Sequence, residues 1–476
     1  MRTLLFTIVC LFITMAGFTQ APFTHVECGI EFTIALRADS TIWICGDNTS
    51  MQYGNYLVSP KDTLFQIQAT EKWTSVAAGG LHVLAISADS TLWGWGENAN
   101  GELGLGYTDE VDTTAQINVT NHWRSISANI SKSMAIRNDG TLWAAGYNYF
   151  GMLGTGDSMD RYLFTQIGAS NDWKVVYAGG LFTLAIKQDG TLWGWGYNGD
   201  GELGMDNTTG IYFSPTQIGM ENNWVSVSGG FRFALAMKAD GTIWATGSNT
   251  NGQLGRPASV LLDSTFKQIG SDNDWKFIGA GALHSFAVRN NGTLWGWGDN
   301  EYGQLGSGIA DTAASVMQIG TDTNWQYITG ADGALSPSTF AVIGYHSAGL
   351  KTNAEGICTA GADYYGQLGT DTIIGLPNAQ FYFDCSVGDN ALAVAYVMKN
   401  AAVNVYPNPA SGLLHIDGIT NTAQYKVVNM MGTVAQTGTL QNGDNTLSIK
   451  HLVPGSYIVT VITEEGKIYN THLVKE

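Results

Sequence analysis

A unit of about fifty residues recurs along this chain, and this repetition constrains the fold more than any other feature. The segment TLWGWGENANGELG at Thr91 returns as TLWGWGYNGDGELG at Thr191 and as TLWGWGDNEYGQLG at Thr293. Counting weaker copies, the first tryptophans fall 50 or 51 residues apart, at Trp43, Trp93, Trp143, Trp193, Trp244 and Trp295. Such a period indicates a repeat architecture, in which each unit buries its apolar surface only against its neighbours.

A second series of tryptophans follows the same period. Its members are Trp73, Trp123, Trp173, Trp224, Trp275 and Trp325. A degenerate copy begins at Gly356 and has Cys358 where the first tryptophan of the unit belongs. We therefore count seven units.

The signals within a unit are of strand type. Short apolar runs such as residues 83–86 are followed by Asp-Gly, Asn-Gly or Asp-Ser and then by Thr-Leu-Trp, the pattern of a tight hairpin. No window has a helical apolar stripe. With about four strands in each of seven units, we predict an all-β fold, a seven-bladed β-propeller.

Tryptophans beside glycines suit such blades. Trp93 and Trp95 point to one face of a strand, so we expect them to be wedged between blades, with Gly94 and Gly96 allowing a close backbone approach. We interpret eight tryptophans of this motif as structural rather than as ligand platforms: Trp93, Trp95, Trp143, Trp193, Trp195, Trp244, Trp295 and Trp297.

The unit over residues 78–104, AGGLHVLAISADSTLWGWGENANGELG, resembles the repeat of the RCC1 (regulator of chromosome condensation) family. The resemblance covers roughly residues 25–398. His82 and His284 occupy the histidine position of the repeat, but Lys132 and Phe182 replace it elsewhere, so we interpret this position as structural. The net charge of −18 makes the chain a poor ligand for nucleic acid, so the resemblance carries the fold but not a chromatin function.

The N-terminus resembles a secretory signal peptide. Arg2 precedes an apolar run over residues 4–16, which is too short to span a membrane, and small or polar residues follow up to Gln20. We predict a signal peptide over residues 1–20, a propeller over 21–398 and a mature chain without a transmembrane segment.

Four cysteines then remain in an oxidising compartment, namely Cys28, Cys45, Cys358 and Cys385. They lie in the first and last units, which ring closure would bring together. Two closing disulfides are possible, three pairings exist, and buried thiols are an equal alternative.

The last part of the chain departs from the repeat. It resembles the type A sorting domain of the type IX (Por) secretion system of Bacteroidota. The features that match are Tyr406, Pro407, Asn408, Pro409, Gly455, Tyr457 and Lys475. We predict a linker over residues 399–404 and a small Ig-like β-sandwich over 405–476. The resemblance implies that the type IX secretion machinery is a partner and that the protein is secreted, via the periplasm, or held at the outer-membrane surface.

Two functions of different classes are compatible with this organisation. The first is a monomeric module that binds an extracellular protein or glycan through the variable segments after each GELG turn, such as residues 106–115 and 256–266. The second is an extracellular hydrolase or lyase with its site at the mouth of the propeller channel. We favour binding, since the Tyr, Phe and Asp content of the variable segments suits recognition. The sequence contains no recognisable catalytic, cofactor or metal motif. Carboxyls with raised pKa at one channel mouth would favour the enzyme, and aromatic side chains on one face would favour binding.

Overall fold

The computed structural model describes residues 21–55, 60–67, 70–117, 122–308, 312–331, 334–335, 342–352, 356–370, 379–387, 404–406, 412–419, 422–429, 434–453, 455–463 and 468–475. Every regular element in these residues is a strand. The chain divides into two compact units, Met1–Asp389 and Asn390–Glu476. The predicted signal peptide, most of the predicted linker and Pro407 to Pro409 lie outside the described residues.

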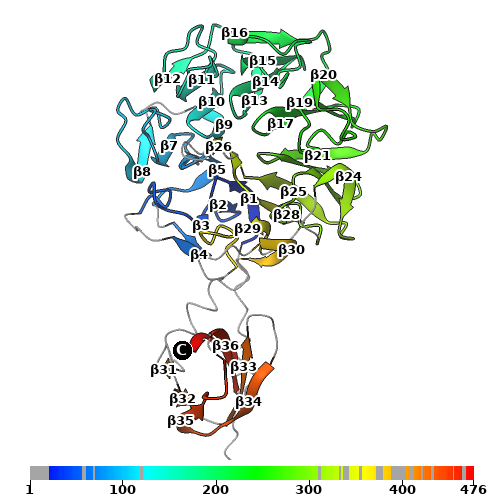
Figure 1. Ribbon diagram of the computed structural model, residues 1–476. Coiled ribbons are helices and arrows are strands. Elements are labelled where there is room, and N and C mark those ends of the chain that lie inside the picture. Colours follow the sequence, from blue (N-terminus) through cyan, green and yellow to red (C-terminus); the bar gives the residue numbers. More distant parts are fainter. Residues whose placement is uncertain are drawn as a thin grey trace, which may run out of the picture. The chain divides into compact units, whose positions relative to one another are not determined.

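The first unit is a ring of seven four-stranded antiparallel sheets in the described part of the chain, which confirms the predicted propeller (Figure 1). The innermost strands are β1 (Phe23–Cys28), β5 (Trp73–Ala78), β9 (Trp123–Asn129), β13 (Trp173–Ala178), β17 (Trp224–Gly229), β21 (Trp275–Ala280) and β25 (Trp325–Gly330). The second strands are β2 (Phe32–Arg37), β6 (His82–Ser87), β10 (Lys132–Arg137), β14 (Phe182–Lys187), β18 (Phe233–Lys238), β22 (His284–Arg289) and β28 (His346–Lys351). A short pair, β26 (Ala334–Leu335) and β27 (Val342–Ile343), is inserted between β25 and β28.

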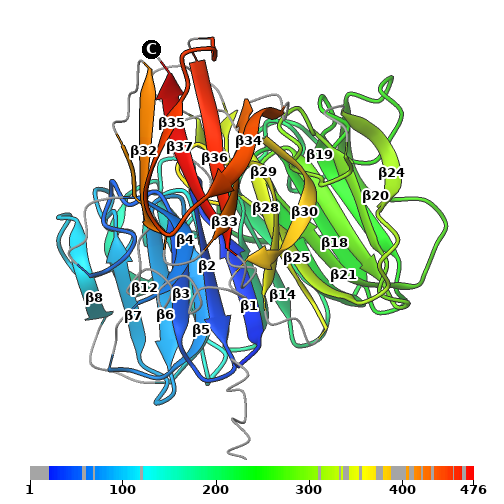
Figure 2. The same cartoon turned by 90° about the horizontal axis from the view of Figure 1, so that it is seen from below.

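The third strands carry the TLWGWG motif. They are β3 (Ile42–Gly46), β7 (Leu92–Gly96), β11 (Leu142–Gly146), β15 (Leu192–Tyr197), β19 (Ile243–Ser248), β23 (Leu294–Gly298) and β29 (Ile357–Ala362). The outer strands are β4 (Lys61–Gln66), β8 (Val111–Ile117), β12 (Arg161–Gln166), β16 (Ile211–Ile218), β20 (Leu262–Gln268), β24 (Ala313–Ile319) and β30 (Ala379–Val387). The innermost strand of each blade therefore begins at a tryptophan of the second series. In the first blade, Phe23 takes the place of this tryptophan. Figure 2 shows these strands from the side.

The ring closes by packing of complete blades. β1 packs against β25 and β28 of the last blade. The Thr33 hydroxyl donates a 2.6 Å hydrogen bond to the Gln367 carbonyl and lies 3.1 Å from Nε2 of His346. We expected residues 386–398 to pack against the N-terminal strands. Ser386 and Val387 end β30, and residues 388–398 lie outside the described part of the chain.

Blades fill the space toward the preceding blade in two ways. In the second, fourth and sixth blades the third strand places a fully buried tryptophan there, namely Trp95, Trp195 and Trp297. At the corresponding position the third, fifth and seventh blades have Ala145, Thr246 and Ala360. Their outer strands supply Phe164, Phe266 and Phe383 instead, where the tryptophan blades have Thr114, Pro215 and Val316. In these six blades one large ring therefore keeps the interior close-packed, whereas the first blade has Cys45 and Leu64 at the two positions.

The glycine that accepts each ring belongs to the preceding blade. A Cβ added at Gly54, which has a φ of +58°, would lie 2.8 Å from the Trp95 ring. Gly154 faces Trp195 in the same way. We expected Gly94 and Gly96 to admit a neighbouring backbone. Gly96 does lie against the main chain of Leu81, but that residue belongs to its own blade.

The first tryptophans of the motif are less buried than the second. Trp93 is half-buried at the hairpin end of its blade, and its Nε1 donates a 2.8 Å bond to the Thr91 hydroxyl. Basic side chains lie over most of these rings, as Arg137 does over Trp143 with 4.0 Å between the guanidinium carbon and the ring centroid. The position of a wedge between blades thus falls to the second tryptophans.

The second unit is a small two-sheet structure. One sheet contains β31 (Asn404–Tyr406), β32 (Leu413–Ile419) and β35 (Gly443–Ser448). The other contains β33 (Ala423–Asn429), β34 (Val434–Leu440), β36 (Gly455–Thr463) and β37 (Ile468–Lys475). Side chains from both sheets share one apolar core, which includes Leu414, Ile416, Val427 and Val459.

Candidate binding surface

The variable loops of the propeller are tied to a constant asparagine. Asn98 follows the third strand of its blade, and its Oδ1 accepts a 3.0 Å bond from the Leu103 main-chain N–H of the tight turn. Its Nδ2 donates a 2.8 Å bond to the Tyr107 carbonyl in the variable loop. The same pair of bonds recurs at Asn148, Asn198 and Asn249. Each loop is therefore held on a rigid support while its own sequence differs from blade to blade.

Large apolar side chains are exposed along the loops and outer strands of the second to fifth blades. We call this set the apolar rim; it consists of Tyr107, Tyr149, Met159, Tyr162, Leu163, Ile211, Phe213, Leu261 and Leu262. Four of its members are strongly exposed, with Met159 at 68%, Leu261 at 65%, Leu163 at 61% and Tyr149 at 61%. Among the described propeller residues, Met220 is the other exposed large hydrophobic residue, on the connection after β16. Grouping of this kind is typical of an interaction surface.

The apolar rim is continuous from blade to blade. The Gly106 N–H donates a 2.7 Å bond to the carbonyl of Tyr162 in the next blade, and Gly156 bonds Phe213 at 2.8 Å in the same way. Outer strands thus reach over the turn of the preceding blade. Residues far apart in the sequence form one surface.

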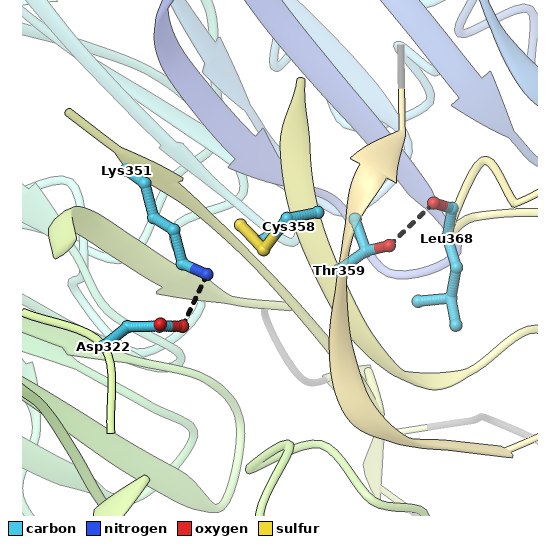
Figure 3. The surroundings of a disulfide bond; sticks show 6 residues. Asp322, Lys351, Cys358, Thr359 and Leu368 are labelled. Atoms are coloured by element: carbon cyan, nitrogen blue, oxygen red, sulfur yellow. Dashed lines mark hydrogen bonds and ion pairs between the residues drawn. A yellow bond between two sulfur atoms is a disulfide. The ribbon is translucent and has the colours of Figure 1, made fainter. Parts of the chain in front are cut away.

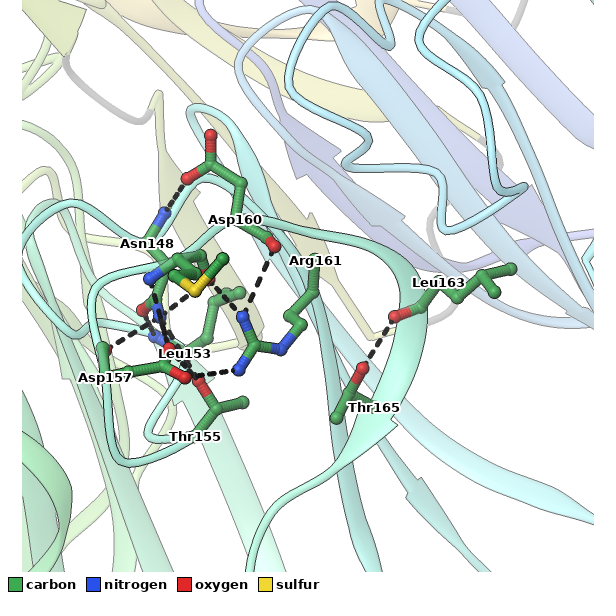
Figure 4. Close-up of polar contacts among 9 residues, drawn as sticks. Asn148, Leu153, Thr155, Asp157, Asp160, Arg161, Leu163 and Thr165 are labelled. Atoms are coloured by element: carbon green, nitrogen blue, oxygen red, sulfur yellow. Dashed lines mark hydrogen bonds and ion pairs between the residues drawn. The ribbon is translucent and has the colours of Figure 1, made fainter.

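The loop of the third blade shows how such a side chain is presented (Figure 4). The Arg161 guanidinium donates a 2.7 Å bond to Asp157 and a 2.6 Å bond to the Met159 carbonyl. Asn148 Nδ2 donates to the carbonyls of Asp157 and Met159, at 2.9 and 3.0 Å. The main chain that carries Met159 is therefore held in one conformation before any partner arrives, which lowers the entropy cost of ordering the loop on binding.

Acidic groups surround the apolar rim. Burial, and next Glu110, raise the pKa of Glu97 in the second blade. The basic side chains Arg161 and Arg256 are ion-paired with Asp157 and Asp263, at 2.7 and 2.5 Å. Asp109 and Glu110 are also exposed beside Tyr107, and Asp206 is exposed in the fourth blade, so the apolar rim has acidic residues on its border.

Several carboxyls at the loop ends of the blades have a raised pKa, the feature expected of an enzyme. Burial raises the pKa of Glu31, Glu102 and Glu202 to about 7, and it also raises the pKa of Asp299. In each case the neighbouring acid that adds to the effect comes from the same blade, as Asp47 does for Glu31. Within the described residues these groups do not form a pair between blades.

Glu102 and Glu202 have a structural role. One carboxylate oxygen of each accepts a 2.8 Å bond from the main-chain N–H two residues earlier, at Asn100 and Asp200. Other blades make this bond with glutamine, at Gln52, Gln253, Gln304 and Gln367. A position that glutamine fills equally well does not depend on proton transfer.

The histidine position of the repeat connects blades. His82 Nε2 lies 3.0 Å from the Ser133 hydroxyl of the next blade, and His284 Nε2 lies 2.8 Å from that of Ser347. Lys132 Nζ donates to the carbonyls of Gly179 and Gly180 in the blade that follows it. Burial lowers the pKa of His82, His284 and His346 to about 3, so these imidazoles are neutral in the folded protein.

The cysteines form one disulfide among the described residues, between Cys358 and Cys385 in the last blade (Figure 3). This bond joins β29 to β30 and does not connect the first blade to the last. Cys28 and Cys45 are buried and are not disulfide-bonded. Cys45 lies against the closing blade, with Sγ 3.6 Å from the Gln367 carbonyl. The two closing disulfides considered from the sequence are therefore not formed. The partner of Cys358 lies within its own blade, and Cys28 and Cys45 of the first blade are not disulfide-bonded.

Residues of the predicted sorting motif lie in the second unit. Tyr457 is buried in the core and its hydroxyl donates a 2.9 Å bond to the Val453 carbonyl. Gly455 begins β36 and pairs with Lys475 near the end of β37. Tyr406 ends β31 and pairs with His415. Asn408, with the two prolines beside it, lies outside the described residues.

Residues outside the repeated motifs supply most of the candidate surface. Tyr162, Leu163 and Phe213 lie on outer strands, where the repeat pattern is weakest. The sequence gives one indication of their exposure: they are apolar residues on the outer strand of a blade, which has no further strand beside it. In the part of the chain that the structure describes, no group of three or more His, Cys, Asp or Glu side chains is placed to hold a metal ion, and no helix could cross a membrane.

The chain matches two families in separate regions. Residues 73–102, 173–202, 224–253 and 275–304 match the regulator of chromosome condensation (RCC1) repeat, and a related model of this repeat matches residues 189–237 and 291–324. Residues 404–476 match the secretion system C-terminal sorting domain.

Known proteins share the propeller but not the whole chain. The probable E3 ubiquitin-protein ligase HERC4 of Mus musculus is 27% identical over 204 residues, which are 42% of this chain and 18% of HERC4. Protein RCC1 of Candida albicans is 33% identical over 128 residues, 24% of this chain and 28% of that protein. This chain thus matches less than a third of the length of either relative.

Two solved structures have the same fold at low sequence identity. Prp20p of Saccharomyces cerevisiae superposes with a TM-score of 0.60 and 19% identity, over 70% of this chain and 83% of Prp20p. Human WBSCR16 does so with a TM-score of 0.59 and 18% identity, over 66% of this chain and 85% of that one. The protein is therefore a seven-bladed propeller built of RCC1 repeats that ends in a secretion system C-terminal sorting domain.

Proposed function

We propose that the protein is exported through the type IX system and binds a protein partner outside the cell or at its surface through the apolar rim. The sorting domain at residues 404–476 supports the export route. The observation that carries the binding function is the apolar rim itself, nine exposed large side chains gathered on adjacent blades. Large apolar and aromatic anchors of this kind supply most of the binding energy of protein interfaces.

A protein fits this surface better than a glycan for a chemical reason. The rim includes aliphatic side chains such as Met159, Leu163 and Leu261 beside its tyrosines. Burial of aliphatic groups against other apolar groups lowers the free energy of the complex. The hydroxyls of a sugar would instead lose hydrogen bonds to water at this surface. The acidic border further favours a partner with a basic surface around an apolar centre.

The experiment uses the full chain and two matched variants. Met159→Asp places a charge in the rim, and Met220→Asp places the same charge at a methionine that is 95% exposed and away from it. Proteins captured from the cell surface by cross-linking are compared by quantitative mass spectrometry. We expect a partner that is retained by the wild type and by Met220→Asp and lost by Met159→Asp, with its complex then measured from purified components. Equal capture by all three proteins would contradict the proposal.

The hydrolase or lyase alternative has weaker support. Glu31, whose pKa is raised to about 7 by burial and next by Asp47, is one of the carboxyls that do not make the repeated bond of Glu102 and Glu202. A single such group gives an enzyme no acid and base pair.

A further inference from the structure

The centre of the propeller contains a cavity of about 340 Å³. All seven inner strands line it, and alternate residues of each strand face inward, as Ser75 and Ala77 do from β5. Its volume is at the lower end of the range for small-molecule sites, roughly 300 to 1,000 Å³, and suits a ligand of monosaccharide size.

One side of the cavity is aromatic. The Phe277 and Tyr327 rings lie 4.8 Å apart between centroids, and the His25 ring lies 5.0 Å from Tyr327 on its other side. These residues come from the sixth, seventh and first blades. We call this cluster of three rings the aromatic shelf; it crosses the ring closure, and its neighbouring ring planes are tilted by 52° and 50°.

A carboxylate lies beside this shelf and has one oxygen to spare. The Tyr327 hydroxyl donates a 2.8 Å bond to Oε1 of Glu27, and His25 Nε2 lies 2.8 Å from the same oxygen. Oε2 has no hydrogen bond to any described residue. Burial, and next the Glu27 charge, raise the pKa of Tyr327, so its hydroxyl stays protonated and remains a donor.

The opposite side of the cavity carries hydroxyls. Ser75, Ser125, Ser226 and Ser228 line it and make no side-chain hydrogen bond to another described residue. Ser127 differs, because its hydroxyl accepts a 3.0 Å bond from the Ala178 N–H. Four hydroxyls therefore face an aromatic shelf and a carboxylate oxygen.

We propose that this cavity binds a neutral, hydroxyl-rich small molecule of monosaccharide size. The apolar face of a sugar ring would lie on Phe277 and Tyr327, and one of its hydroxyls would donate to Oε2 of Glu27. No lysine or arginine lines the cavity, and Glu27 repels negative charge, so an anion is excluded. An ammonium group can only donate, whereas the serines can donate and accept, which matches hydroxyls.

The site differs from the apolar rim and does not depend on it. The rim is on outer strands and loops, whereas the cavity is lined by the inner strands. Occupation of one leaves the other accessible.

The test measures binding of defined probes to the full chain by saturation-transfer NMR and calorimetry. The probes are the methyl glycosides of glucose, galactose and mannose, N-acetylglucosamine, and tetramethylammonium as a cationic comparison. We expect at least one sugar to bind and tetramethylammonium not to. Glu27→Gln should weaken sugar binding roughly tenfold, the effect of losing a hydrogen bond to a charged group. Ser226→Leu, which fills the cavity, should abolish it.

Controls separate a lost site from a lost fold. Met159→Asp on the apolar rim should bind the sugar as the wild type does, and thermal unfolding should show that Glu27→Gln and Ser226→Leu remain folded. Absence of binding by every sugar at millimolar concentration, sugar binding that Glu27→Gln and Ser226→Leu leave unchanged, or binding of tetramethylammonium alone would overturn the proposal. Failure here leaves the rim proposal intact, because that proposal is tested by Met159→Asp.

Discussion

The indole N–H of Trp95 donates a 2.7 Å hydrogen bond to the main-chain carbonyl of Gln52 in the preceding blade. Trp195 and Trp297 make the equivalent bonds to Met152 and Gln253, at 3.0 and 2.8 Å. These bonds join one blade to the next at three of the seven junctions, those before the second, fourth and sixth blades. The remaining junctions use phenylalanine or smaller residues and lack the bond.

The two packing modes should be interchangeable. Trp95→Ala removes a fully buried ring and should lower the free energy of unfolding by about 3 to 5 kcal/mol. Adding Thr114→Phe reproduces the Ala145 and Phe164 pair of the next blade and should recover part of that loss. Trp93→Ala, at a half-buried ring, should cost less than Trp95→Ala. Urea unfolding of the four proteins tests this, and an unchanged loss in the double variant would contradict the volume argument.

Acid should destabilise the ring through its buried histidines. The pKa of His284 is about 3 in the folded protein against 6.5 for an exposed imidazole, so only the unfolded state takes up this proton between those values. The contribution of neutral His284 to the free energy of unfolding is complete above pH 6.5. It is lost as the pH falls toward 3, by about 1.4 kcal/mol per pH unit. His284→Phe, a residue that Phe182 provides in the fourth blade, should make the free energy of unfolding less steep in this window. Chemical denaturation at several pH values measures how steeply the free energy of unfolding depends on pH. The effects of the buried carboxyls cancel in the comparison, because both proteins contain them.

Glu102→Gln should act in the opposite direction. The pKa of Glu102 is about 7 when folded, above its usual 4.5, so its contribution is complete below pH 4.5 and is lost as the pH rises through 7. Glutamine makes the same bond at Gln52 without a charge. The variant should therefore have a higher melting temperature than the wild type at pH 8 and a similar one at pH 5. A lower melting temperature at pH 8 would show that the carboxylate is needed there.

Loosening the Met159 loop should weaken partner binding without removing any apolar group. Arg161→Ala deletes the bonds to Asp157 and to the Met159 carbonyl. Hydrogen exchange at residues 155–160 should become faster, and dissociation of the partner should become faster as well. Arg232→Ala, at a half-exposed arginine 3.7 Å from Asp200, is the control and should change neither.

Deletion of residues 404–476 should leave the propeller inside the outer membrane, because these residues match the sorting domain. The full chain and its Met159→Asp variant should both reach the surface or the medium. Cell fractionation with an antibody to the propeller distinguishes the cases. Secretion of the truncated chain at the level of the intact one would contradict the sorting function.

The repeat pattern predicted much of the fold because it is carried by residues that recur. The tryptophan period gave the number of blades, and the Asp-Gly and Asn-Gly turns gave the hairpins. It did not reveal which tryptophan is the wedge. Trp93 and Trp95 share a face of the strand, but Trp95 alone lies deep between blades, and its burial depends on the empty space at Gly54 of the preceding blade.

The candidate sites depend on residues that do not recur. His25, Glu27 and Tyr327 fall at variable positions of inner strands about 300 residues apart, and only closure of the ring brings them together. The apolar rim joins Tyr107 to Leu262 because consecutive blades lie side by side and the outer strand of each contacts the turn of the preceding blade. The sequence by itself determined the repeat, its strand content and the sorting domain, since these follow from local spacing and turn chemistry. The tertiary structure decided the cysteine pairing, because this depends on which strands of the last blade lie side by side. It also decided the channel wall and the rim, because these depend on which residues of different blades become neighbours in space.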